Sequence, residues 1–151
     1  MSASLSSANE RSALSARCSH FGSCGGCSHQ DVPYDRQLEA KTARVAELLK
    51  PFHAVPQPHG SPDIWYYRNK MEFSFGDVYP VRLAGPNLKL GLKPKGRWYE
   101  ILDLQECFLL SPETPALLAA VRQWAAAEGL LPYNSHKHTG LLRHLVVREA
   151  K

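Results

Sequence analysis

The chain has 151 residues, of which 44% are hydrophobic and 21% are charged. This length is typical of one domain with its own hydrophobic core, and the composition excludes a disordered or fibrous protein. No apolar run approaches the roughly 18 residues of a membrane span, and the first residues lack the apolar core of a secretion signal. We therefore expect a cytoplasmic protein with no membrane partner.

The net charge of +4 is concentrated in the middle of the chain, where residues 61–98 carry seven Lys or Arg against three Asp or Glu. The stretch from Val78 to Trp98 contains five basic residues and no acidic one: Arg82, Lys89, Lys93, Lys95 and Arg97. Such a patch attracts a polyanion through phosphate contacts and counterion release. A solvated basic surface without a partner is the alternative that charge alone leaves open.

Residues 1–17 consist mainly of Ser and Ala with few large apolar side chains. They cannot bury enough surface to offset the entropy of ordering, so we expect a disordered tail. The remaining residues, 18–151, form the predicted domain.

The first predicted helix runs from Tyr34 to Leu49. Asp31 is placed to cap it, Pro33 is tolerated in its first turn and Pro51 ends it. Apolar residues at helical spacing predict that this helix lies on a core: Tyr34, Leu38, Val45, Leu48 and Leu49.

A second helix is predicted after Ser111, which provides a hydroxyl cap, with Pro112 at the first helical position. Gly129 is a plausible stop at its C-terminus. The apolar stripe that we expect to pack comprises Leu117, Leu118, Val121, Trp124 and Ala125.

Apolar and polar residues alternate in the segment from Tyr67 to Phe75, as on a half-buried strand. A hairpin is predicted from Leu88–Leu92 and Arg97–Leu102, joined by a basic turn, and a last strand from Leu141 to Glu149. The predicted fold class is α/β (α+β), with an antiparallel sheet and two main helices.

Three of the four cysteines, Cys18, Cys24 and Cys27, lie within ten residues, and Cys107 follows Cys27 after 79 intervening residues. Clustered thiolates are good ligands for zinc and for iron–sulfur clusters. In a reducing compartment this spacing favours metal binding over two disulfides. If Cys107 supplies a fourth ligand, the metal ties the start of the chain to its second half.

Two kinds of metal site remain open from the residues alone. A zinc site would combine Cys24 and Cys27 with two of Cys18, His20, His29 and Cys107. Three clustered cysteines and one distant cysteine are also a common iron–sulfur arrangement. Glycines that allow tight wrapping and free backbone N–H groups fit the latter: Gly22, Gly25 and Gly26.

Four blocks of the sequence resemble the iron–sulfur RNA uracil-5-methyltransferases, which modify ribosomal or transfer RNA with S-adenosylmethionine. The blocks are Cys18–Tyr34, Trp65–Gly76, Leu102–Cys107 and Thr139–Arg148. The resemblance implies a [4Fe–4S] cluster on Cys18, Cys24, Cys27 and Cys107. It also implies that the chain is the central RNA-binding domain of such an enzyme.

In enzymes of this family a cysteine adds to C6 of a flipped-out uracil, and C5 then takes the methyl group. The catalytic cysteine, the general base and the Gly-rich S-adenosylmethionine site belong to a C-terminal methyltransferase domain that this sequence lacks. We therefore expect no catalytic or S-adenosylmethionine-binding residue here, and a truncated or split chain that is inactive alone. A separate methyltransferase-domain polypeptide is one way to complete it.

RNA is the expected partner. The residues predicted to contact it are Arg68, Asn69, Lys70, Lys93, Lys95, Arg97, Arg143 and His144. Arg68 and Asn69 could instead form hydrogen bonds at the sheet edge or in a loop. The lysines could serve only to keep the protein soluble. The alternative function is a stand-alone iron–sulfur or zinc module that binds RNA or carries electrons.

Overall fold

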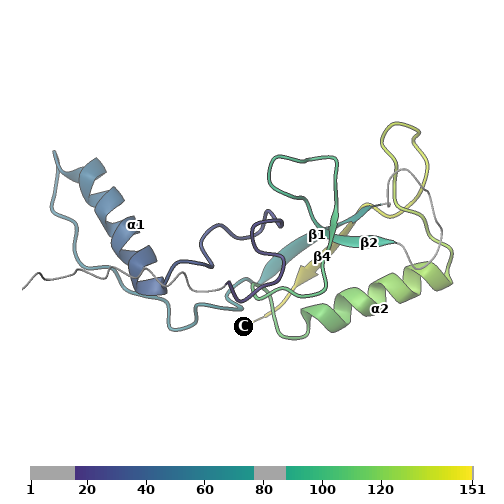
Figure 1. Cartoon of the computed structure of the whole chain (residues 1–151), viewed down its shortest axis with the longest axis horizontal. Coiled ribbons are helices and arrows are strands. Elements are labelled where there is room, and N and C mark those ends of the chain that lie inside the picture. Colours follow the sequence, from purple (N-terminus) through teal and green to yellow (C-terminus); the bar gives the residue numbers. More distant parts are fainter. Residues whose placement is uncertain (1–15, 77–87, 151) are drawn as a thin grey trace, which may run out of the picture.

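The computed structural model describes residues 16–76 and 88–150. Residues 1–15 of the tail predicted at residues 1–17, together with Arg82 and Lys151, therefore lie outside the described residues. The elements follow the order α1 (Tyr34–Leu49), β1 (Lys70–Gly76), β2 (Lys89–Leu92), β3 (Leu102–Asp103), α2 (Thr114–Ala127) and β4 (His144–Arg148). The strands form one antiparallel sheet in the order β3-β2-β1-β4. Helix α2 lies along one side of the sheet, and α1 lies apart from it (Figure 1). The predicted antiparallel sheet with two helices is confirmed.

The central strand β1 supplies much of the core. Met71, Phe73 and Phe75 are buried, whereas Lys70 and Glu72 are exposed, as the alternation predicts. Strand β4 pairs with β1 in a register that places Leu145 opposite Phe73. One face of these strands is therefore apolar core and the other is polar.

The predicted hairpin exists, but its second strand is shorter than expected. Strand β3 contains only Leu102 and Asp103, because successive turns occupy the preceding residues. The N–H of Arg97 bonds to the carbonyl of Pro94 at 3.1 Å, and the N–H of Glu100 bonds to the carbonyl of Arg97 at 3.2 Å. Trp98 and Tyr99 consequently lie in a turn and not in a strand.

Helix α2 covers the core but begins later than predicted. Its first residue is Thr114, and the hydroxyl of Ser111 bonds to the carboxylate of Glu149 at 2.6 Å. The prediction that Ser111 caps this helix is therefore wrong. Leu118 and Ala125 are buried, but Trp124 is 53% exposed, so its predicted packing is also wrong. The helix ends at Ala127, and Gly129 follows with a left-handed φ of 62°, which confirms the predicted stop.

Helix α1 has the predicted bounds but not the predicted environment. No residue of α1 is buried, and among the described elements it makes no packing contact with another helix or strand. Leu48 is 59% exposed, so the prediction that the stripe lies on a core is wrong. Asp31 does not cap the helix, because Pro33 occupies the N-cap position without a side-chain hydrogen bond. Gln37 instead bonds through Nε2 to the carbonyl of Val32 at 2.8 Å.

The cysteine-rich segment packs against the sheet. Cys107 belongs to the buried core, and Cys24 and Cys27 are partly buried against it. Within residues 16–76 and 88–150, no helix is long and apolar enough to cross a membrane.

Candidate metal centre and nucleic-acid surface

Residues 18–27, which we call the cysteine knuckle, contact the turn of the β2–β3 hairpin through backbone atoms. The N–H of Gly25 bonds to the carbonyl of Lys93 at 3.2 Å, and Cys24 forms an isolated antiparallel bridge with Pro94. A Cβ atom at Gly25 would lie 2.6 Å from the Lys93 carbonyl oxygen. Gly25 is therefore needed for this close approach, as the sequence predicts for a tightly wrapped segment.

Two further hydrogen bonds connect the knuckle to the segment that contains Cys107. The N–H of Ser19 bonds to Oε1 of Glu106 at 2.6 Å, and the N–H of Gln105 bonds to Nε2 of His20 at 3.0 Å. This contact gives His20 a supporting role, since its Nε2 accepts a bond from the segment that carries Cys107. The two contacts bring together parts of the chain that are more than 80 residues apart.

All four cysteines line one small cavity of about 20 Å³, so the fold brings the distant Cys107 close to the other three. Burial raises the pKa of the thiols of Cys18, Cys24 and Cys107. Thiolates there need a compensating positive charge, which bound metal ions supply. The N–H of Gly26 points at Sγ of Cys24 at 3.3 Å, the type of contact that supports a thiolate ligand.

The arrangement of the thiols bears on the kind of metal site that fits. Within the described residues, no group of three or more His, Cys, Asp or Glu side chains is arranged to hold a single metal ion. In a [4Fe–4S] cluster each cysteine binds a different iron, so four sulfurs around a shared cavity suit it as a donor set. A cluster is larger than this cavity, and the knuckle cysteines that line it are partly exposed. The ligand set stays a prediction.

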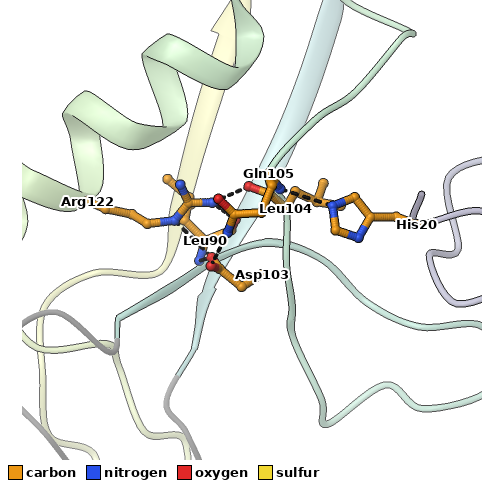
Figure 2. A network of polar contacts seen from close by, with 6 residues as sticks. All are labelled: His20, Leu90, Asp103, Leu104, Gln105 and Arg122. Carbon is orange, nitrogen blue, oxygen red and sulfur yellow. Dashed lines mark hydrogen bonds and ion pairs between the residues drawn. The ribbon is translucent and has the colours of Figure 1, made fainter. Parts of the chain in front are cut away.

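A network of polar contacts fixes the chain just before Cys107 (Figure 2). Nε of Arg122, on α2, bonds to Oδ1 of Asp103 at 2.8 Å. Its Nη2 bonds to the carbonyl of Leu90 at 3.1 Å and also to the carbonyl of Leu104. Nε2 of Gln105 bonds to Oδ2 of Asp103 at 2.6 Å. The network extends from α2, through β3, to His20 of the knuckle.

The structure separates the predicted RNA-contacting residues into two groups. Because β1 and β4 are antiparallel and Lys70 pairs with Arg148, the residues 68–70 lie at the opposite end of the sheet from His144, which pairs with Ser74. Arg68 is half-buried, its Nη1 lies 3.3 Å from Sδ of Met71, and its guanidinium lies near Cys24. The carbonyl of Asn69 accepts the N–H of Glu149 at 2.9 Å. This group therefore lies closer to the core and the cysteines.

The second group surrounds an open groove of about 990 Å³, which is lined by Lys93, Arg143 and His144 among others. Lys95 and Arg97 lie in the adjoining turn. Nη1 of Arg97 forms an ion pair with Oε2 of Glu100 at 2.7 Å, so its charge is already partnered. Lys93 and Lys95 are exposed and are therefore the stronger candidates for phosphate binding in this turn.

Sequence reasoning missed several residues that line the same groove. They are Trp98, Tyr99, Tyr133 and His136. Trp98 and Tyr99 directly follow the basic turn, and this position could have indicated a binding surface. The predicted strand from Arg97 to Leu102 placed both residues in the sheet instead. Tyr133 gave no such signal, because only the fold brings its loop to the groove.

Comparison with known proteins finds relatives among the RNA methyltransferases. No protein-family model matches the chain. The chain is 38% identical over 143 residues to an uncharacterized RNA methyltransferase of Clostridium tetani, and 36% identical over 143 residues to one of Clostridium acetobutylicum. It is 34% identical over 139 residues to a tRNA (uracil(54)-C(5))-methyltransferase of Pyrococcus horikoshii. The chain is homologous to RNA methyltransferases.

These matches cover 91–92% of this chain but 30–31% of the length of each methyltransferase. The chain thus corresponds to about a third of its RNA methyltransferase relatives. The resemblance to RNA uracil-5-methyltransferases, drawn from four sequence blocks, is confirmed by these relatives.

Proposed function

We propose that the chain is the RNA-recognition and [4Fe–4S] cluster segment of an S-adenosylmethionine-dependent RNA uracil-5-methyltransferase that acts on transfer or ribosomal RNA. Two observations support the proposal. Almost the whole chain matches RNA methyltransferases, one of them named for uracil in tRNA, and its four cysteines line a single cavity.

In this proposal Cys18, Cys24, Cys27 and Cys107 hold the cluster. When bound, the cluster supplies metal–thiolate bonds that tie the knuckle to the second half of the chain. His20 and Arg122 position the segment that carries Cys107, through the hydrogen bonds of Gln105 and Asp103. Bound there, the cluster would hold the knuckle against the hairpin turn that Gly25 and Cys24 contact.

The basic side chains near the hairpin provide the RNA contacts. Lys93 and Lys95 are exposed on the turn that the knuckle supports, and Arg143 lies across the groove. Their positive charges bind phosphates and orient the RNA toward the catalytic part of the enzyme.

We assign methyl transfer to no residue of this chain. All four thiols line the proposed metal cavity, so none is available as the nucleophile that adds to uracil. The uracil-modifying chemistry and the S-adenosylmethionine site belong in this proposal to sequence outside this chain, in the same protein or in a partner polypeptide.

The cluster is tested by purifying the chain anaerobically and measuring iron, sulfide and zinc. Cys107→Ser should lower iron and sulfide, whereas His29→Ala should leave both unchanged, since His29 is exposed and outside the proposed ligand set. One zinc per chain without sulfide would refute the cluster, and loss of zinc in His29→Ala would favour the zinc site.

The RNA contacts are tested by measuring affinity for a structured tRNA fragment across a series of salt concentrations. Reversing the charges of Lys93 and Lys95 should reduce the salt slope by about 0.7–0.9 for each phosphate that the variant no longer neutralises. In the matched control, the charges of Lys41 and Arg44 on α1 are reversed, since these side chains are also exposed. Equal slopes for the two double variants would remove the hairpin turn from the RNA surface.

A further inference from the structure

The groove of about 990 Å³ is lined by residues of two turns. Both turns extend from the sheet on the side away from α2 (Figure 1). One turn contains Trp98 and Tyr99, and the other contains Tyr133 and His136. Polar ends of β1 and β4 form its floor, including Ser74 and His144. We call this site the aromatic groove.

Trp98 and Tyr99 present unusually large apolar surfaces to solvent, since each is 71% exposed. Adjacent exposed aromatic rings in a concave site mark a binding surface. The ring centroids are 5.8 Å apart and the ring planes are at 89°. Two flat ligand groups that stack on these two rings therefore cannot stack on each other.

The opposite side of the aromatic groove holds a pre-positioned cation. The guanidinium of Arg143 lies 3.5 Å from the centroid of the Tyr133 ring. Its backbone carbonyl accepts the N–H of Phe75 at 3.0 Å, which fixes Arg143 to strand β1. The hydroxyl of Tyr133 is 3.0 Å from Nδ1 of His138, so the ring itself is held in place. A stacked guanidinium keeps its N–H donors free at the edge for an anion.

The described residues that line the aromatic groove carry a net positive charge, since Lys89, Lys93 and Arg143 are basic and Glu100 is acidic. That carboxylate is neutralised by its ion pair with Arg97. Basic side chains interleaved with exposed aromatic rings are the combination by which proteins bind single-stranded nucleic acids.

We propose that the aromatic groove binds unpaired nucleotides of the RNA, with bases stacked on Trp98 and Tyr99 and phosphates held by Lys89, Lys93 and Arg143. This inference rests on the proposed function, because it names the part of the RNA that the segment receives. Bases within a duplex have both faces covered by neighbouring bases, so they cannot use the exposed rings. The perpendicular rings select a strand whose successive bases point in different directions.

The test compares Trp98→Ala with Trp124→Ala in the full-length chain. Trp124 is a matched control, since it is also exposed but lies on α2, away from the aromatic groove. Binding of a labelled single-stranded RNA of about 8 nucleotides and of a blunt, fully paired two-strand RNA duplex is measured by fluorescence anisotropy. Trp98→Ala should weaken binding of the single strand about 5- to 100-fold and binding of the duplex less than about twofold. Trp124→Ala should change neither, and Trp98→Phe should retain most of the affinity.

Each failure has a distinct signature. If Trp98→Ala weakens both RNAs equally, or neither, while wild-type binding remains salt-dependent, the aromatic groove is not a site for unpaired bases although RNA recognition stands. If the wild-type chain binds neither RNA, the proposed function fails as well. An acidic peptide that binds as tightly as the single strand, with the same dependence on Trp98, would overturn the assignment to nucleic acid.

Discussion

Replacing Arg122 by Met tests the network that fixes the segment before Cys107. Methionine keeps most of the apolar length of the side chain but removes every hydrogen bond of the guanidinium. The carbonyl of Leu90 retains the N–H of Leu104 as a partner at 3.2 Å, whereas the Leu104 carbonyl loses the bond from Arg122. Asp103 keeps its bonds to the N–H of Leu90 and to Gln105 but loses its cation.

The expected cost follows from these changes. A buried carbonyl without a partner costs about 1–3 kcal/mol, and a hydrogen bond to a charged group is worth about 1.5–3 kcal/mol when shielded from water. The Arg122 side chain is 15% exposed and that of Asp103 is 32% exposed, so the ion pair counts toward the lower end of its range. The free energy of unfolding should fall by about 2–4 kcal/mol.

Urea unfolding followed by circular dichroism measures this change, with the iron content of each preparation determined in parallel. Arg36→Met is the matched control, because Arg36 forms its 2.7 Å pair with Glu39 on the open surface of α1. That variant should match the wild type in both measurements. If Arg122→Met shifts the unfolding midpoint no more than Arg36→Met does, the network contributes nothing to stability and the reasoning fails.

Three further predictions concern the knuckle, the core and the metal. Gly25→Ala should lower the iron content, because a Cβ atom there would lie 2.6 Å from the Lys93 carbonyl oxygen. Ser23→Ala, in the same exposed stretch, should leave the iron content unchanged. Equal iron content in the two variants would contradict a role for the backbone contact. Phe73→Ala should destabilise the chain by about 3–5 kcal/mol in urea unfolding, since Phe73 is fully buried, while Leu48→Ala should have a small effect. Removing metal with a chelator should lower the thermal unfolding midpoint, and an unchanged midpoint would show that the metal does not tie the chain together.

Local patterns predicted the elements whose neighbours are close in sequence. Alternation identified β1 and its buried Met71, Phe73 and Phe75, and helical spacing with Pro51 gave α1 its bounds. The grouping of four cysteines around one cavity was also predictable, because three lie together and only one remained to join them.

Long-range contacts account for the features that sequence reasoning missed. Local rules predict that the hydroxyl of Ser111 caps helix α2. In the fold this hydroxyl instead donates a hydrogen bond to the carboxylate of Glu149, which is 38 residues away in sequence. Trp98 alternates correctly for a strand, yet the turn bonds that begin at Pro94 exclude it from the sheet. No local pattern connects Tyr133 to the aromatic groove, since only the tertiary fold places the loop that carries it beside Trp98 and Tyr99.

The separation of α1 from the sheet has a consequence for local stability. Its first turns are anchored, because the hydroxyl of Tyr34 accepts the N–H of Ser61 at 2.7 Å and Gln37 bonds to the carbonyl of His29. Its last turn carries Leu48 and Leu49, which are exposed. A helix of 16 residues with so little packing is close to the length at which isolated helices are marginal in water. Amide hydrogens of α1 should therefore exchange along a gradient, slowest near Gln37 and fastest near Leu49, while the sheet amides exchange only when the domain opens as a whole.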